Sequence, residues 1–122
     1  MPNYSVLVVE DEVQLRTTLI RFLHEEGYTV QGTPDGESAL SWLAQQPFDI
    51  LLLDMSLPRM DGWELARRLR ESGQDTAIVV LTAAERAREV ADQIGAVGYV
   101  AKPFALLHLL RVLERALEEE VA

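Results

Sequence analysis

The chain has 122 residues, of which 48% are apolar and 25% are charged, so it is long enough for one globular domain with a single core. Its 20 acidic and 11 basic residues leave a net charge of −9, which argues against direct binding to nucleic acid or to a membrane surface. The absence of cysteine excludes disulfides and thiolate chemistry, and without a signal peptide or an apolar run near the roughly 18 residues of a membrane span we expect a cytoplasmic protein.

Short apolar or β-branched runs alternate along the chain with segments of helical periodicity. The first helical segment has Leu19 and Leu23 on one face and is closed by Gly27, whereas the third is expected to be capped by Asp61 and closed by Gly73. In chain order the predicted elements are strand 5–9, helix 12–26, strand 28–32, helix 35–46, strand 49–53, helix 61–72, strand 77–81, helix 84–95, strand 97–101 and helix 104–119.

Five strand–helix units in this order predict an α/β fold of the (βα)₅ type. The runs 5–9, 50–53 and 77–81 are almost wholly apolar, as central strands covered on both faces are, and the more polar second run reads as an edge strand. We therefore expect a flavodoxin-like three-layer sandwich, with a parallel sheet of strand order 2-1-3-4-5 and helices on both faces. Residues 1–122, with a core of about 4–120, are expected to form this single domain without an effector domain.

Polar side chains with reactive groups follow four of the five predicted strands. Glu10 and Asp11 follow the first strand, Asp54 the third, Thr82 the fourth and Lys102 the fifth. The second strand ends without a reactive side chain. Because ligands of open α/β sheets bind beyond the carboxyl ends of the strands, we expect these five residues to share one crevice.

Three carboxylates in one crevice repel each other unless one holds a proton or a cation lies among them. Oxygen ligands of this kind suit Mg²⁺, which commonly binds one or two carboxylates together with a phosphate. An aspartate beside Mg²⁺ can act as a nucleophile towards a phosphoryl group, whose charge the metal, Lys102 and the hydroxyl of Thr82 would neutralise. Lys102 is the only lysine among the eleven basic residues, and a compact ammonium suits a single phosphoryl oxygen.

Each of these residues also has a simpler interpretation. Glu10 and Asp11 can cap the first helix, and Asp54 can be a turn residue. Thr82 can cap the fourth helix, which is compatible with a role in the crevice, and a lone lysine is usually solvated surface. The conjunction of all five residues at the ends of four neighbouring strands favours a common site.

Four segments of the chain resemble the receiver domain of two-component response regulators, and the resemblance covers about residues 4–120. In order they are "VLVVEDE", "DILLLDMSLPRMDGWEL", "VVLTA" and "YVAKPF". Each segment alone is a weak signal, but the four together, in this order and at this spacing, are specific.

The resemblance implies a role for each matched residue. Asp54 would accept a phosphoryl group from a histidine kinase or a histidine phosphotransfer protein. Mg²⁺, or Mn²⁺ in its place, would be held by Glu10, Asp11, Asp54 and the backbone carbonyl of Met55. Lys102 would contact both the phosphoryl group and Asp54.

The resemblance also implies a switch. Thr82 would move to bond a phosphoryl oxygen, and Tyr99 would swing inward with it. The peptide bond between Lys102 and Pro103 would be cis, which is tolerable because the second residue is proline.

The last two helical segments suggest where a signal would leave the site. The helix over 84–95 has few large apolar residues and should be weakly docked. In the helix over 104–119, Leu107 and Val112 widen the apolar stripe beyond what packing on the sheet needs, unless they are scattered surface residues. We expect the face formed by these helices and the strand 97–101 to bind a downstream protein or a second copy of the chain.

Two other functions are compatible with the same fold. A phosphatase with an aspartate nucleophile typically needs a second acid two residues further on, where this chain has Ser56. An FMN-binding module would need phosphate-binding N–H groups in the first loop, which is acidic here. We therefore expect a signalling domain and no true enzyme, with at most weak autophosphorylation from small phosphodonors and slow autodephosphorylation. His24 and His108 are expected to be surface residues.

Overall fold

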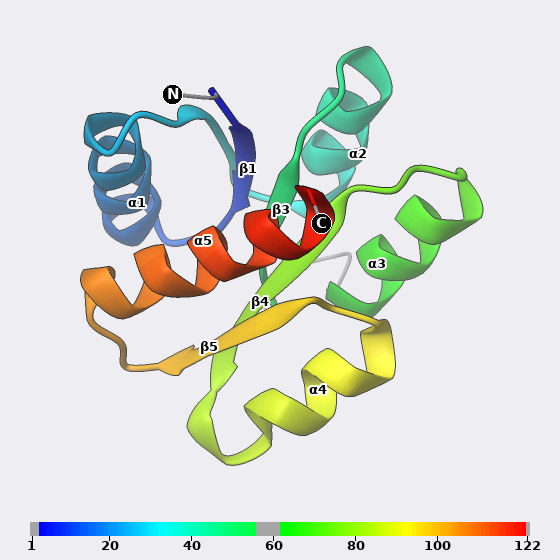
Figure 1. Cartoon of the computed structure of the whole chain (residues 1–122). Helices are drawn as coiled ribbons and strands as arrows, with labels where there is room; N and C mark the ends of the chain where they lie inside the picture. Colours follow the sequence, from blue (N-terminus) through cyan, green and yellow to red (C-terminus); the bar gives the residue numbers. More distant parts are fainter. Residues whose placement is uncertain (1–2, 56–61, 122) are drawn as a thin grey trace.

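A computed structural model describes residues 3–55 and 62–121, and within them strands and helices alternate (Figure 1). The elements are β1 (Ser5–Val9), α1 (Val13–Glu25), β2 (Thr29–Thr33), α2 (Gly36–Gln45), β3 (Ile50–Asp54), α3 (Gly62–Glu71), β4 (Ala77–Ala83), a 3₁₀ turn (Ala84–Arg86), α4 (Ala87–Ile94), β5 (Gly98–Lys102) and α5 (Leu106–Val121). The predicted order of strands and helices is confirmed. The proposed cap Asp61 lies outside the described residues.

The five strands form one parallel sheet of order β2-β1-β3-β4-β5, as the sequence predicts. The central strands are buried, and the apolar residues Val6–Val9, Ile50–Leu53 and Ile78–Leu81 have no exposed surface. β2 is an edge strand and only its last residue, Thr33, is fully buried. Runs that are apolar at every position therefore mark the strands covered on both faces.

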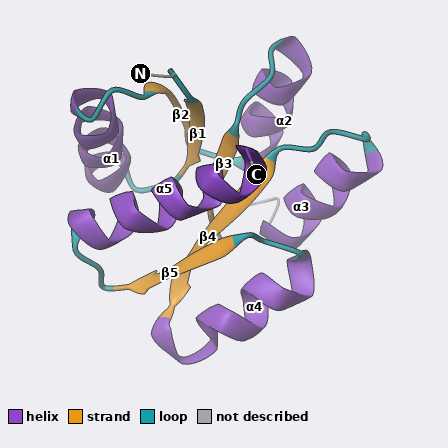
Figure 2. Cartoon of the chain, in the orientation of Figure 1, coloured by secondary structure: helices purple, strands orange, loops and turns teal. Residues whose placement is uncertain are grey.

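Helices cover the sheet in two layers (Figure 2). On one face α1 and α5 bury their apolar stripes, which include Leu19, Leu23, Leu109 and Leu113, against alternate residues of β1, β3 and β4. On the other face α2, α3 and α4 pack against the remaining alternate residues, since successive side chains of a strand point to opposite sides. The chain is a three-layer α/β sandwich of the flavodoxin-like type.

Local signals account for the ends of several helices. The side chain of Glu12 caps α1 by accepting a hydrogen bond from the backbone N–H of Leu15 at 2.8 Å. Gly95 ends α4 in the left-handed region, with φ of 72°, a conformation that suits glycine. In the part of the chain that the structure describes, no helix combines the length and the apolar character needed to cross a bilayer.

Two sequence-based expectations need correction. β4 runs to Ala83, two residues further than predicted, so Thr82 is a strand residue and the cap position of the following 3₁₀ turn is Ala83. Val112 is no spare surface residue, because it packs against the core beside Gly98, whose missing side chain leaves room for it. Leu107, by contrast, is 63% exposed.

Candidate metal and phosphoacceptor site

Glu10 is a buried acid of the site, and two hydrogen bonds hold its backbone while a third holds its carboxylate. It is 1% exposed and follows β1 directly. Its backbone N–H donates to the carbonyl of Thr33 at 3.0 Å, its carbonyl accepts from Nη1 of Arg16 at 2.8 Å, and its Oε2 accepts from the N–H of Glu12 at 3.1 Å. The carboxylate is therefore fixed at the end of the sheet before any ligand arrives.

Asp54 occupies the corresponding place at the end of β3. It is 2% exposed, and the N–H of the next residue, Met55, still bonds the carbonyl of Leu81 in β4 at 3.0 Å. This bond extends the strand pairing past the acid and limits how far its backbone can move. Asp11 is exposed, yet one carboxylate oxygen each of Glu10, Asp11 and Asp54 lie within 4.8 Å of one another.

Lys102 closes the cluster from the end of β5. Its Nζ atom lies 3.1 Å from Oδ1 of Asp54 and 3.8 Å from Oε1 of Glu10. The lysine side chain is one-third exposed, whereas both carboxylates are buried. Its peptide bond to Pro103 is cis. The structure thus brings together four residues that the sequence places on three different strands.

Burial dominates the electrostatics of this cluster. It raises the pKa of Glu10 from 4.5 to about 7, and the negative charge of Asp54 acts in the same direction. The hydrogen bond from the N–H of Glu12 and the positive charge of Lys102 lower the same pKa and offset part of the rise. Glu10 therefore changes its protonation near neutral pH.

Glu10, Asp11 and Asp54 fit a divalent metal ion. Among the described residues the Oε1 atom of Glu10 is buried and makes no hydrogen bond, although a buried carboxylate oxygen normally has a partner. The donors that converge here are all carboxylate oxygens, the ligand type that Mg²⁺ and Mn²⁺ prefer. The ion pair of this Oε1 atom with Lys102, at 3.8 Å, is too long for a hydrogen bond, so a cation among the carboxylates would give this oxygen a close partner and relieve their mutual repulsion.

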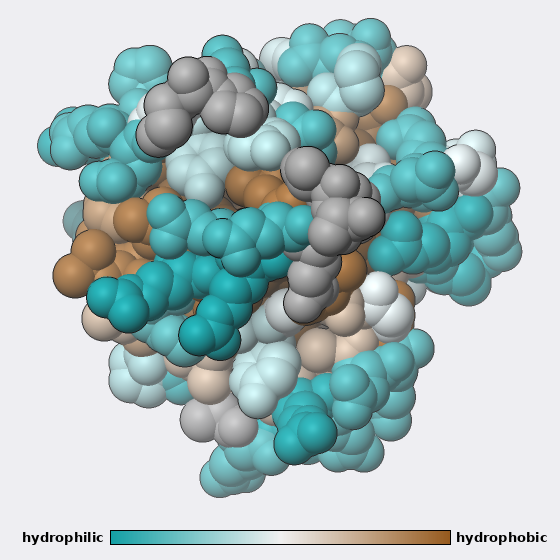
Figure 3. Space-filling model, viewed as in Figure 1, coloured by the Kyte–Doolittle hydropathy of each residue, from teal (hydrophilic) through white to brown (hydrophobic). Residues whose placement is uncertain are grey.

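Thr82 lies near the carboxyl end of β4, and Tyr99 lies in β5, the strand that ends at Lys102. Thr82 is half-buried, one position after the register partner of Asp54, and pairs with Ala101 of β5. Tyr99 is 40% exposed and borders a hollow of about 490 Å³ along α4. Figure 3 shows that the outer surface of α4 is hydrophilic, while apolar surface lies over the beginning of α5. The aromatic ring therefore has open space beside it.

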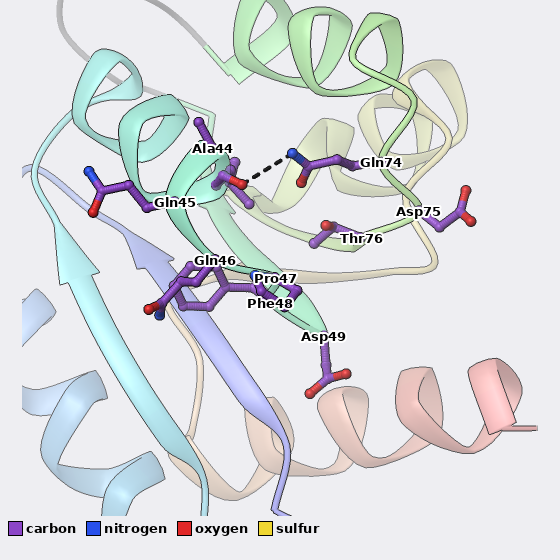
Figure 4. A pocket seen from close by; sticks show the side chains of 10 residues that line it. Ala44, Gln45, Gln46, Pro47, Phe48, Asp49, Gln74, Asp75 and Thr76 are labelled. Atoms are coloured by element: carbon purple, nitrogen blue, oxygen red, sulfur yellow. Dashed lines mark hydrogen bonds between the residues drawn. The ribbon is translucent and has the colours of Figure 1, made fainter.

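Another hollow, of about 480 Å³, lies at the opposite end of the sheet (Figure 4). The segments that lead into β3 and β4 form it, with Pro47, Phe48 and Asp49 on one side and Gln74 on the other. The Nε2 atom of Gln74 donates to the carbonyl of Leu43 at 3.1 Å and ties the two segments together. The carboxylate cluster lies at the other strand ends, so this hollow takes no part in its chemistry.

Sequence reasoning missed three residues that hold the site. The predicted end of the second strand carries no reactive group, yet the carbonyl of Thr33 accepts the N–H of Glu10. Glu12 is the helix cap, and Arg16 binds the carbonyl of Glu10. An arginine in the first turn of a helix that follows an acidic loop was the available signal. His24 and His108 are exposed, as expected, and Ser56 lies outside the described residues.

Comparisons with known proteins identify the family of the chain. The family model of the response regulator receiver domain matches residues 6–114. The chain is 44% identical over 110 residues to the response regulator MprA of Mycobacterium ulcerans (strain Agy99), covering 88% of this chain and 47% of that protein. It is 41% identical over 126 residues to MprA of Mycobacterium tuberculosis (strain ATCC 25618 / H37Rv), covering 98% of this chain and 55% of the relative. The chain thus spans about half the length of the curated relatives it matches.

A solved structure leads to the same family. The chemotaxis response regulator CheY4 of Vibrio cholerae superposes with a TM-score of 0.86 at 32% sequence identity. The superposition covers 94% of this chain and 99% of that one. The similarity therefore extends over nearly the whole of both chains.

Proposed function

The chain belongs to the response regulator receiver domain family, and we propose from this membership and from the carboxylate–lysine cluster that it is a phosphoacceptor signalling domain of a two-component system. Asp54 is the proposed acceptor. The observation that carries the proposal is the placement of its buried carboxylate among Glu10, Asp11 and the ammonium of Lys102. The extent of the domain, about residues 4–120, and the absence of true enzyme activity are part of the same proposal.

In the proposed reaction an oxygen of Asp54 attacks the phosphorus of a phosphohistidine on a histidine kinase or a phosphotransfer protein. The new P–O bond forms as the P–N bond breaks, and the donor imidazole keeps the electron pair of that bond. Lys102, at 3.1 Å from Asp54, is placed to pair with a phosphoryl oxygen, and the Thr82 hydroxyl is proposed to bond another.

A divalent cation belongs to this proposal because the donor set fits it. Glu10, Asp11 and Asp54 would hold Mg²⁺, or Mn²⁺, together with the backbone carbonyl of Met55. When bound, the ion would neutralise charge on the transferred group. The chain itself holds these acids close together. Hydrogen bonds fix Glu10, and the β3–β4 pairing that continues after Asp54 fixes Asp54.

We further propose that the α4-β5-α5 face transmits the phosphorylated state. The large apolar contacts that dock α4 are few, with Val90 at 6% exposure and Ile94 partly buried, and its remaining buried residues are alanines. Tyr99 borders the hollow beside α4, and Leu107 adds exposed apolar surface on α5. Movement of Thr82 and Tyr99 towards the site would shift α4 and change this face for a protein partner or a second copy.

The context proposed for this domain is the cytoplasm, with a histidine kinase or phosphotransfer protein upstream and a protein partner downstream. The net charge of −9 supports neither nucleic-acid nor membrane binding by this chain itself. The relatives are response regulators, and about half of their length lies outside the part that matches this chain.

Binding of beryllofluoride, which mimics an aspartyl phosphate, tests the proposed function. Fluorine NMR of the chain with beryllofluoride should show a bound signal that requires both Mg²⁺ and an intact Asp54. Asp54→Asn should give no bound signal, whereas Asp49→Asn, at the amino end of β3, should bind like the wild type. A bound signal that persists in Asp54→Asn would overturn the assignment of the acceptor.

A further inference from the structure

Arg16 joins three parts of the chain next to the carboxylate cluster. It lies in the first turn of α1, and its Nη1 atom donates to the carbonyl of Glu10 at 2.8 Å. Its Cγ lies only 3.2 Å from the position that a Cβ on Gly32 would occupy, so the aliphatic part of the side chain crosses β2 closely. The half-buried arginine is therefore wedged between the edge strand and the loop that carries the acids.

In the described part of the chain, the guanidinium of Arg16 binds a backbone carbonyl and none of the acids that precede it in the sequence. Three acids, at positions 10–12, precede it in the sequence, yet within residues 3–55 and 62–121 it forms no ion pair with any of them. Its contact is the backbone carbonyl that links Glu10 to Asp11. A charged donor on a carbonyl gives a stronger hydrogen bond than a neutral one, and it restricts the rotation of that peptide.

We propose that Arg16 is a positioning residue for the metal ligands. By holding the Glu10–Asp11 peptide, it sets the directions in which the two carboxylates leave the backbone, and so keeps both within reach of one cation. This inference rests on the metal binding of the proposed function. Groups that hydrogen-bond to metal ligands commonly affect metal affinity in this way, because they orient the ligands before the metal binds.

The sign of one measurement separates positioning from simple electrostatics. Removing a positive charge near a cation site should strengthen cation binding, because a repulsion disappears. Removing a group that orients the ligands should weaken it. The Arg16→Met substitution does both, and positioning is the larger effect in this proposal.

Calorimetric titration of the metal-free full chain with Mg²⁺, at a pH of about 8 where Glu10 is mostly ionised, tests the proposal. Arg16→Met should bind Mg²⁺ about tenfold more weakly than the wild type. Arg16→Lys keeps the positive charge but replaces the planar guanidinium by a compact ammonium, so its Mg²⁺ affinity should fall between those of the wild type and Arg16→Met. Arg21→Met removes the same charge from an exposed position of the same helix and should bind at least as tightly as the wild type.

Each outcome decides between the claims. Wild-type or tighter binding by Arg16→Met would overturn the positioning role and leave the metal site in place. No Mg²⁺ binding by the wild-type chain would overturn the metal site of the proposed function and this inference with it. Far-ultraviolet circular dichroism without metal identifies variants that do not fold. If Arg16→Met is one of them, Arg16→Lys decides: weaker binding supports the role, and wild-type binding contradicts it.

Discussion

The Nζ atom of Lys102 lies 3.1 Å from Oδ1 of Asp54, although the two residues end strands that are not neighbours. β4 lies between β3 and β5, so the lysine side chain reaches across the end of β4 to meet the acid. At that point β4 carries Ala83, the register partner of Lys102. A small side chain on the middle strand leaves the path to Asp54 open.

Lys102→Met should raise the pKa of Glu10 further above about 7. The positive charge of Lys102 lowers this pKa at present, so its loss favours the protonated carboxyl. Carbon-13 NMR of the glutamate carboxyl groups, recorded in metal-free protein across the pH range, measures the change. Arg111→Met, which removes a charge from an exposed position of α5, should leave the pKa of Glu10 unchanged. An unchanged or lowered pKa in Lys102→Met would contradict the geometry.

Glu10 should make the stability of the metal-free protein depend on pH. Its pKa is about 7 in the folded chain against 4.5 as the ordinary value, so the folded state binds the proton more tightly. The resulting stabilisation is fully present below about pH 4.5 and is lost as the pH rises through about 7, by about 3 kcal/mol at most. Urea unfolding of wild type and Glu10→Gln, with a chelator present, isolates this contribution as the difference between the two pH profiles. Parallel profiles would argue against the raised pKa.

Proton binding by Glu10 also predicts the pH dependence of metal affinity. A metal ligand must be deprotonated, so Mg²⁺ binding should release a proton below about pH 7 and should strengthen as the pH rises to that value. The same calorimetric titration, repeated in buffers of different ionisation enthalpy, counts the released protons. An affinity that is constant from about pH 5.5 to 8 would contradict the assignment of Glu10 as a ligand.

Gly62→Ala should destabilise the protein and disturb the residue after Asp54. A Cβ at position 62 would lie 2.5 Å from Sδ and 3.2 Å from the backbone Cα of Met55. The sulfur can move, but the Cα belongs to the segment held by the bond between Met55 N–H and Leu81. We expect a loss of about 1–3 kcal/mol in the free energy of unfolding.

A double-mutant cycle with Met55→Ala tests the cause of that loss. In the Met55→Ala background the sulfur contact is gone, so Gly62→Ala should destabilise by less than it does in the wild type. Chemical denaturation of the four proteins gives the coupling energy. Strict additivity of the two substitutions would show that the contact between positions 55 and 62 is not the source.

Arg70 should hold the carboxyl-terminal end of α4 in place. Its Nη1 donates to the carbonyl of Thr76 at 3.1 Å and its Nη2 to the carbonyl of Gly95 at 3.3 Å, which joins α3 to the end of α4. Arg70→Met should cost about 1–2 kcal/mol of stability and speed amide exchange near Gly95. Arg68→Met, on the same helix, removes an exposed pair with Glu64 and should cost clearly less stability than Arg70→Met. Equal effects of the two substitutions would show that the hydrogen bonds of Arg70 do not hold the end of α4 in place.

Local pattern was enough to predict the frame of this molecule. The apolar runs of β1, β3 and β4 are central strands because they are covered on both faces, and a more polar run could only lie at an edge. The reactive residues Glu10, Asp54 and Lys102 could be grouped before their positions were known, because parallel strands present their carboxyl ends at one edge of the sheet.

Contacts that depend on the packing of one element against another could not be predicted from local patterns. A helical wheel gives Val112 no packing partner, but the missing side chain of Gly98 on β5 leaves a space that this valine enters. Thr82 reads as a helix cap in the sequence, but strand pairing with β5 extends β4 past it and makes it a strand residue. The bond from Arg16 to the carbonyl of Glu10 depends on the packing of α1 across β2, which no local period encodes.

The central claim is that Asp54 accepts a phosphoryl group in a metal-dependent reaction. Its most direct test is the intact mass of the chain during incubation with acetyl phosphate. The wild type should gain the mass of one phosphoryl group with Mg²⁺ present, gain none with a chelator, and lose it again as the acyl phosphate hydrolyses. Asp54→Asn should gain none under any condition. A mass gain in Asp54→Asn equal to that of the wild type, or none in the wild type with Mg²⁺, would contradict the claim.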